Sequence, residues 1–410
     1  MNPGKRRNLQ LDVLRGVAIL LVFGRHLQIP HPEGVVGAFA EFWYRIGWLG
    51  VELFFVLSGF LIGGLLISEF AKNGRIDVSR FLVRRGLKIY PAYFVFIAYL
   101  MLMPSAKEWI HGGSALATLG AEWARYWPNL LFLQNYVGTN PAGHTWTLAV
   151  EEHFYLLLPV MLFALAAMGR MRLIVPVCGA IVLLCLALRS LAVWTNDPFA
   201  AKMSATHLRL DALLFGVGLR GVAQYFPERF AAMRPWRGAL VLAGVLLWLP
   251  NCFIEPGTAL IRTVGLTATF LGSAAFLVAA YHTRSTDFGR WSRLASPAAS
   301  LVAWIGVYSY AIYLWHVTAM GILEREFGGR LVALNGAMTS LTWLICALAI
   351  SVGAILAGVV ASKLVEWPVL RLRDRFFPSR SGPLPTPNAE SPAAPISPVV
   401  SSSLPTVEAN

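Results

Sequence analysis

Residues 340–362 read SLTWLICALAISVGAILAGVVAS, a run without a single charged side chain. Roughly 20 apolar residues, wound as a helix, are enough to cross the hydrocarbon core of a bilayer. Comparable runs recur about ten times along the chain, near 9–28, 47–68, 89–104, 144–167, 173–194, 207–225, 238–254, 260–282, 299–322 and 340–362. Helices are predicted, because the strands of a barrel would give short segments of alternating polarity.

The composition also indicates a membrane protein. Of 410 residues 57% are apolar and only 13% are charged, and the mean hydropathy of +0.61 lies above the range of soluble globular chains. The first run is expected to stay in place rather than be cleaved as a signal peptide, because it contains Asp12, Arg15 and His26 and lacks a small-residue cleavage site. We predict an all-α integral membrane protein with about ten transmembrane helices in one bundle.

The formal charge of +13 follows the predicted topology. If Lys5, Arg6 and Arg7 are inside, most of the 34 Lys and Arg fall in inside segments, as the positive-inside rule requires. Both termini are therefore predicted to be cytoplasmic, and nucleic acid is not expected as a partner. The four cysteines lie in or beside apolar runs without paired spacing, which predicts packing roles and neither disulfides nor a metal site: Cys178, Cys185, Cys252 and Cys346.

Two segments of different composition make up the chain. Residues 1–377 are predicted to form one membrane domain. Residues 378–410 contain eight prolines and seven serines and few large apolar groups, so they are predicted to form a disordered cytoplasmic tail. No internal repeat of the kind that marks many transporters is visible, which counts mildly against transport.

The first run places three polar groups in or near the bilayer. Arg15 and His26 are eleven residues apart, so they share one helix face about 16 Å apart along the axis. Asp12 precedes Arg15 by three residues and can pair with it. Either Asp12 and Arg15 neutralise each other at the inner interface while His26 reaches the outer one, or the three belong to a functional site.

Further polar groups lie on later runs. Glu151 sits within the run that begins HTWTLAVEEHFY (144–155), with His144 on its face; it either braces two helices or charges and orients a histidine acting as a general base. In SYAIYLWH (309–316), Ser309, Tyr313 and His316 form one stripe that is either a packing seam or a substrate contact.

Two shorter motifs raise narrower questions. Arg209 and Asp211 are two residues apart, so they are expected to meet different partners. Gly59 and Gly63 have a spacing that suits close helix packing. Ser58, beside them, would need a base within hydrogen-bond reach to act as a nucleophile.

The densest basic cluster follows the second run: Arg75, Arg80, Arg84, Arg85 and Lys88. It is either a topology signal attracted to anionic lipid or a phosphate clamp, since guanidinium groups bind phosphate oxygens bidentately. The predicted topology puts Asp12, Arg15, Arg84, Arg85 and Lys88 toward the inner side, and it puts His26, His144, Glu151, Arg209, Asp211 and His316 toward the outer side. A reaction with one substrate on each side of the membrane fits this division.

These motifs together resemble the membrane-bound acyltransferase 3 family over nearly all of residues 9–376. The resemblance rests on LDVLRG (11–16) with the Arg15–His26 spacing, FFVLSGFLI (54–62), RRGLKIYP (84–91), HTWTLAVEEHFY (144–155), LRLDALLFG (208–216), SYAIYLWH (309–316) and VEWP (365–368) with Glu366. It implies acyl-CoA as the donor, an essential pair Arg15 and His26, Glu151 near the reaction centre, and phosphate contacts from Arg84 and Arg85. Thr147 stands where the family usually has serine, and Lys88 where arginine is commoner.

The predicted function is O-acylation across the membrane. Acyl-CoA, most simply acetyl-CoA, binds Arg84, Arg85 and Lys88 as a substrate rather than a resident cofactor, and His26 accepts the proton of an acceptor hydroxyl while Glu151 stabilises the imidazolium and Arg15 assists. Residues expected to contact substrate are Asp12, Ser58, Arg209, Asp211, Tyr313 and His316. The expected acceptor is an extracytoplasmic glycan such as surface polysaccharide or lipopolysaccharide.

The hypothesis also predicts a location and partners, and it leaves two other functions open. The expected location is the bacterial inner membrane, and the expected partners are membrane lipid, acyl-CoA and the glycan. Either the chain transfers the acyl group directly, or a separate extracytoplasmic transferase completes the transfer. Two other functions stay open: an acyltransferase for a small molecule such as a macrolide, and a transporter of a sugar or lipid-linked intermediate, because intramembrane His, Glu and Arg also mark proton relays.

Overall fold

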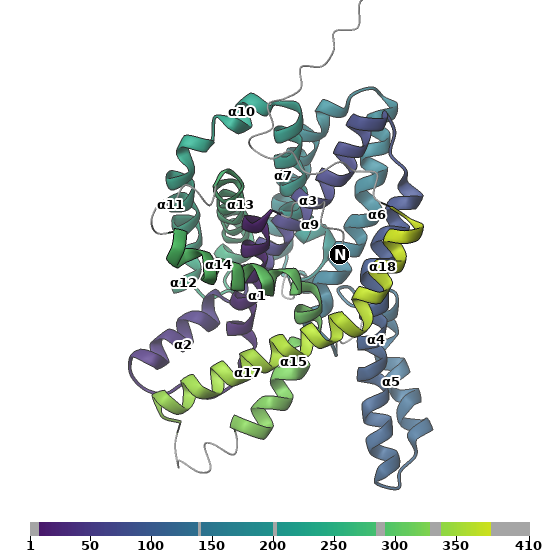
Figure 1. The fold of residues 1–410 in the computed structure, drawn as a ribbon, viewed down its shortest axis with the longest axis vertical. Helices are drawn as coiled ribbons and strands as arrows, with labels where there is room; N and C mark the ends of the chain where they lie inside the picture. Colours follow the sequence, from purple (N-terminus) through teal and green to yellow (C-terminus); the bar gives the residue numbers. More distant parts are fainter. Residues whose placement is uncertain (1–7, 138–140, 200–202, 284–291, 329–337, 379–410) are drawn as a thin grey trace, which may run out of the picture.

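A computed structural model of the chain describes residues 8–137, 141–199, 203–283, 292–328 and 338–378. In these ranges all regular structure is helical (Figure 1). Of the predicted tail only Pro378 lies in the described residues. The elements are α1 Leu9–His26, α2 Val35–Ile46, α3 Leu49–Asn73, α4 Val78–Ile110, α5 Ala115–Leu130, η1 Gly143–Thr145, α6 Trp146–Ala167, η2 Met171–Leu173, α7 Ile174–Trp194, α9 Thr206–Tyr225, α10 Pro227–Ala231, η3 Arg234–Trp236, α11 Arg237–Trp248, α12 Pro250–Phe253, η4 Ile261–Gly265, α13 Leu266–His282, α14 Ser292–Val307, α15 Ser309–Leu323, η6 Glu324–Gly328, α17 Ser340–Ala361, η7 Ser362–Glu366 and α18 Trp367–Phe376.

Each of the ten predicted apolar runs falls on helix, so the helical membrane class is confirmed. Seven helical segments of the described chain are long and apolar enough to cross a bilayer, and a bent pair adds an eighth. α1 and α9 are outside that count, because each carries three acidic or basic side chains. Their charged groups are nevertheless those that the sequence analysis singled out.

The sequence predicted one helix over the run 299–322, but the structure does not show a single straight helix there. The run is divided between α14 and α15, which meet at an angle of 79°. Tyr308, between them, has φ −98° and ψ 6°, which ends the first helix and starts the second in a new direction. The bend matters for the site, because α15 carries three of the residues that line the cavities described below.

Close packing of α3 against α9 confirms the expectation for Gly59. The α carbon of Gly59 faces the backbone carbonyl of Leu213, and Gly216 on α9 faces the backbone of Val56 in return. A Cβ atom at either glycine would overlap these groups, so only glycine allows this approach. Figure 1 shows the two helices side by side in the upper half of the bundle.

Two apolar clusters form the core. One is centred on α3, α6, α9 and α13, and the other on α1, α4, α15 and α17. Val51, Phe54 and Tyr310 pack against both clusters. In Figure 1, α17 crosses the bundle obliquely and leads through η7 into α18, which packs beside α4. The candidate site lies where the two clusters meet.

Candidate active site

A cavity of about 570 Å³, called here the larger cavity, opens between the two apolar clusters. Helices α1, α3, α4, α6, α14 and α15 line it, and η7 with α18 forms one further wall. Its polar lining residues are Arg15, Ser58, Arg85, Lys88, Thr147, Glu151, Tyr155, Ser309, Tyr310, Tyr313, Glu366, Arg371, Arg373 and Asp374. Most of the predicted inner-side residues are therefore brought together by the fold.

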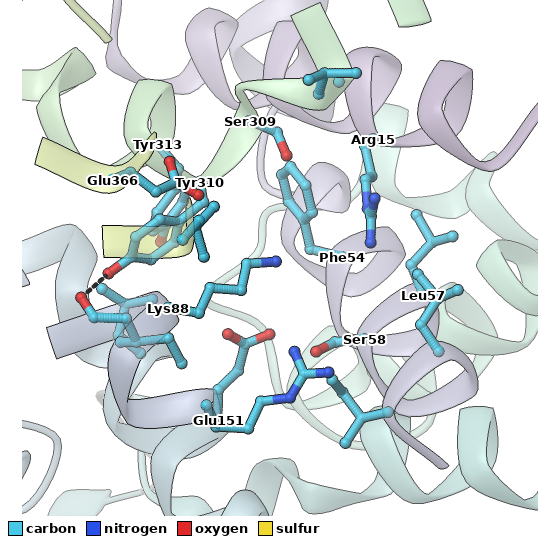
Figure 2. Close-up of a pocket in the computed structure, with 18 of the residues that line it drawn as sticks. Arg15, Phe54, Leu57, Ser58, Lys88, Glu151, Ser309, Tyr310, Tyr313 and Glu366 are labelled. Carbon is cyan, nitrogen blue, oxygen red and sulfur yellow. Dashed lines mark hydrogen bonds between the residues drawn. The ribbon is translucent and has the colours of Figure 1, made fainter. Parts of the chain in front are cut away.

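Charged side chains of both signs converge on the centre of this cavity. Figure 2 shows Lys88, Arg15, Glu151 and Ser58 pointing toward one another across the open space. Arg85, one turn before Lys88 on α4, also lines the cavity. A basic surface of this kind attracts phosphate. The carboxylates that also line the cavity balance part of this positive charge, which would otherwise be costly to bury among apolar groups.

Glu151 is held by hydroxyl groups on two helices. The Tyr155 hydroxyl, one turn later on α6, donates a hydrogen bond to Glu151 Oε2 at 3.3 Å. The same hydroxyl lies 3.5 Å from Ser58 Oγ on α3. Glu151 therefore belongs to the larger cavity with Arg85 and Lys88. Glu151 and His26 line different cavities, so the predicted contact between them is not seen among the described residues.

Arg15 and Asp12 form the predicted ion pair. Arg15 Nη1 lies 3.0 Å from Asp12 Oδ1, and the two residues are one turn apart on α1. Asp12 is buried, whereas Arg15 is half-buried and reaches the larger cavity. The carboxylate balances the guanidinium charge and fixes its position, so Asp12 acts here through Arg15.

A second cavity, called here the smaller cavity, has a volume of about 330 Å³. It lies near the C-terminal end of α1 and the N-terminal end of α3, away from Arg15 and Ser58. Its lining includes His26 and Trp48 from those ends. Further lining residues with polar groups are Arg25, His144, Trp146, Arg209, Arg262 and Tyr313. The predicted outer-side residues His26, His144 and Arg209 thus share this cavity.

Three histidines gather beside the smaller cavity. The His26 ring centroid is 4.9 Å from that of His316 and 6.4 Å from that of His144. His316 Nδ1 lies 2.6 Å from the Tyr313 carbonyl oxygen, and His144 Nε2 lies 3.0 Å from that of Leu314. Since a carbonyl only accepts, those two nitrogens carry the protons.

The other nitrogen of each of these two rings is then an acceptor. His316 Nε2 and His144 Nδ1 are buried and have no hydrogen-bond partner within the described part of the chain. In the neutral form, each of these two rings offers an acceptor nitrogen near His26. No group of three or more His, Cys, Asp or Glu suited to a metal ion is found in the described ranges.

Tyr313 and Val51 line both cavities and form the wall between them. The Tyr313 hydroxyl donates to the His144 carbonyl oxygen at 2.7 Å and lies 2.7 Å from Thr147 Oγ1. Because threonine keeps the hydroxyl of serine, the departure at Thr147 preserves this bond. A group that crosses from one cavity to the other passes Tyr313.

Arg84 lies apart from its neighbour Arg85. Its guanidinium pairs with Asp374 at 3.2 Å and donates to the carbonyl oxygen of Phe377. It is not among the residues that line the larger cavity. The predicted phosphate clamp is therefore divided: Arg85 and Lys88 face the cavity, and Arg84 holds the segment that follows α18.

Arg209 and Asp211 meet different partners, as predicted. Arg209 pairs with Glu52 of α3, and Asp211 pairs with Arg189 of α7. Arg209 also reaches the smaller cavity. Asp211 is 2% exposed and lines neither cavity, so its expected contact with substrate is corrected to a role in helix packing.

Asp211→Asn should destabilise the protein strongly. The substitution leaves the Arg189 guanidinium, whose side chain is 1% exposed, without its counter-charge. Removing one partner of a buried ion pair costs about 3–5 kcal/mol. Thermal unfolding in detergent should therefore show a clear loss, whereas Glu41→Gln, at the exposed pair with Arg45, should change little. Unchanged stability with lost turnover would restore Asp211 as a substrate residue.

The sequence analysis missed the contribution of α18. Arg371, Arg373 and Asp374 line the larger cavity, and they lie just after the VEWP motif. The signal was present, because residues 367, 370, 371 and 374 follow the i, i+3, i+4, i+7 spacing of one helix face. Tyr310, whose hydroxyl donates to the Ile89 carbonyl at 2.8 Å, is a second lining residue that was missed (Figure 2).

Comparisons with known proteins agree with this arrangement. A family model described as an acyltransferase domain matches residues 8–360. The chain is 28% identical over 322 residues to the peptidoglycan O-acetyltransferase OatA of Listeria monocytogenes, covering 75% of this chain and 48% of the relative. It is 27% identical over 344 residues to the putative peptidoglycan O-acetyltransferase YrhL of Bacillus subtilis, covering 78% and 50%.

The O-acetyltransferase OatA of Staphylococcus aureus is similar to the same degree, with 27% identity over 316 residues that cover 75% of this chain and 49% of the relative. The chain spans about half the length of these curated relatives. No solved structure is a significant match.

Proposed function

The chain belongs to the membrane-bound acyltransferase 3 family, and from that premise we propose that it transfers an acetyl group from cytoplasmic acyl-CoA to a hydroxyl of an extracytoplasmic glycan. The observation that carries the proposal is the pair of cavities separated by Val51 and Tyr313. One cavity has the basic groups that a phosphate-rich donor needs. The other has the histidines that can accept a proton from a hydroxyl.

The larger cavity receives the donor. Its opening is on the cytoplasmic side, because the positive-inside rule puts the basic start of α4 there. Arg85 and Lys88 bind CoA phosphates, since arginine forms bidentate bonds to phosphate and lysine adds a point charge. Glu151 and Ser58 point into the cavity. We place the pantetheine arm beside them, so that the carboxylate accepts hydrogen bonds from its amide groups.

The smaller cavity receives the acceptor. Trp48 and Trp146 line it, and the indole Nε1–H of Trp48 is a buried donor that lacks a partner within the described residues. A sugar supplies both a ring face for the indoles and oxygens for this donor. Since two relatives are named peptidoglycan O-acetyltransferases, a peptidoglycan glycan is the first acceptor to test. A bacterial cytoplasmic membrane is the corresponding location.

His26, which lines the smaller cavity, is the proposed proton acceptor. The acceptor oxygen attacks the thioester carbonyl carbon, and its proton passes to the unprotonated nitrogen of His26. The carbon–sulfur bond then breaks, and the CoA sulfur takes the proton back from His26. The second N–H of the imidazolium donates to one of the two rings beside His26, His316 or His144, while the first returns its proton to the sulfur. These rings replace Glu151 in the role that the sequence had suggested for it.

Acceptor-dependent release of CoA tests the proposal. The full chain in nanodiscs is incubated with radiolabelled acetyl-CoA and a peptidoglycan disaccharide, and free thiol and sugar-bound label are measured. The expected result is thiol release only with the sugar present, with the label recovered as a base-labile ester. If CoA stays intact while the sugar crosses the membrane of sealed vesicles, the protein is a transporter and the proposal is wrong.

A further inference from the structure

We propose that α18 forms the cytoplasmic wall of the donor site and that Arg371 and Arg373 bind the phosphates of acyl-CoA together with Arg85 and Lys88. This inference rests on the proposed function, because it assumes that the larger cavity holds the donor. It adds a binding element that lies beyond residue 360, where the family match ends.

α18 presents one face to the cavity. Its lining residues are Trp367, Leu370, Arg371, Arg373 and Asp374, which lie on one side of the helix. The opposite side carries Leu372 and Phe376, which are both more than half exposed, and Arg375 lies between the two sides and does not line the cavity. The helix is thus divided into a charged face toward the cavity and an outer face that the cavity does not use.

The connection between α17 and α18 sets the direction in which the charged face of α18 points. The last turn of α17 runs into η7, a π-helical turn over Ser362–Glu366, and Pro368 follows at the start of α18. Proline has no N–H to continue the regular bonding of the helix, so a wider turn is accommodated here. Glu366, at the end of the turn, lines the cavity and accepts a hydrogen bond from Ser362 Oγ at 2.8 Å.

Two arginines of α4 anchor the other end of α18. Arg84 bonds to Asp374 and to the Phe377 carbonyl, and Arg80 donates to the Pro378 carbonyl. Cations at the C-terminal end of a helix satisfy its last carbonyl groups and its dipole. This anchoring explains why Arg84 does not face the cavity. It also keeps the two basic residues of α18 opposite those of α4.

The charges around this end of the cavity favour an anionic ligand. Arg85 and Lys88 on α4 face the same space as Arg371 and Arg373 on α18. Asp374 is the acidic residue of α18 among them, and it is already paired with Arg84 and with Arg373 at 2.8 Å. Arg371 is exposed, and no ion pair of it is found in the described ranges. Guanidinium groups in such a position bind phosphate.

The test compares variants of the full chain in nanodiscs for binding of CoA and of pantetheine, which lacks the phosphates. Arg371→Gln with Arg373→Gln should weaken CoA binding at least about tenfold and make it less sensitive to salt. Pantetheine binding should stay unchanged. Arg375→Gln removes a basic side chain of the same helix that does not line the cavity, so it is the matched control and should bind CoA within about twofold of the parent.

The outcomes separate the inference from the proposed function. If the parent binds no CoA, the proposed function fails. If the parent binds CoA and the double variant binds it equally well, α18 is not part of the donor site. An equal loss for Arg375→Gln would mean that α18 acts through anionic lipid rather than through the donor, and it would overturn the inference as well. Thermal unfolding of each variant verifies that the substitutions in α18 have not disturbed the helix bundle.

Discussion

His26→Ala should lower turnover by about a hundredfold or more while leaving acyl-CoA affinity within a few-fold of the parent. The reason is its position: His26 lines the smaller cavity, and Arg85 and Lys88, the proposed phosphate-binding groups, line the larger one. Removal of the imidazole therefore takes away the proton acceptor without touching the donor site. Steady-state rates at saturating acetyl-CoA, together with equilibrium binding of CoA, measure the two effects separately.

His207→Ala is the matched control. His207 is exposed, contacts Tyr136, and lines neither cavity, so its loss should leave turnover close to that of the parent. The mechanism would be wrong if His26→Ala weakened CoA binding strongly and kept near-normal turnover at saturation. His26 would then be a binding or packing residue.

Val51→Trp should block transfer while the donor still binds. Val51 is one of the two residues shared by the cavities, and an indole at this position fills the wall where we propose that the thioester and the hydroxyl meet. Displacing reacting groups by about 1 Å can cost about a hundredfold in rate, so we expect a loss of at least that size. Acceptor-dependent thiol release measures it.

Val307→Trp provides the comparison, because it adds the same volume to the larger cavity away from the shared wall. It should weaken donor binding and retain part of the turnover at saturating donor. Overpacking costs about 1–3 kcal/mol in general, so both variants are compared at temperatures where unfolding shows them to be folded. Equal turnover in the Val51 variant and the parent would show that the acyl group does not pass this wall.

Several features of the protein followed from the sequence alone. The apolar runs predicted the helices, since the length and polarity of a segment decide whether it can span a bilayer. The Asp12–Arg15 pair and the different partners of Arg209 and Asp211 were also predicted correctly. These properties depend on spacing within one helix, and helix geometry relates spacing directly to direction.

The tertiary structure alone decided which faces meet. Arg84 and Arg85 are adjacent, yet one anchors α18 and the other faces the cavity, because a helix turns about 100° per residue and the position of α18 selects the face. Glu151 faces the larger cavity instead of His26 for the same reason, since the crossing of α1, α4 and α6 sets its neighbours. Such crossings arise from contacts between segments far apart in the chain, like Gly59 against Leu213. The glycine spacing indicated close packing there, but no local pattern identifies the partner helix.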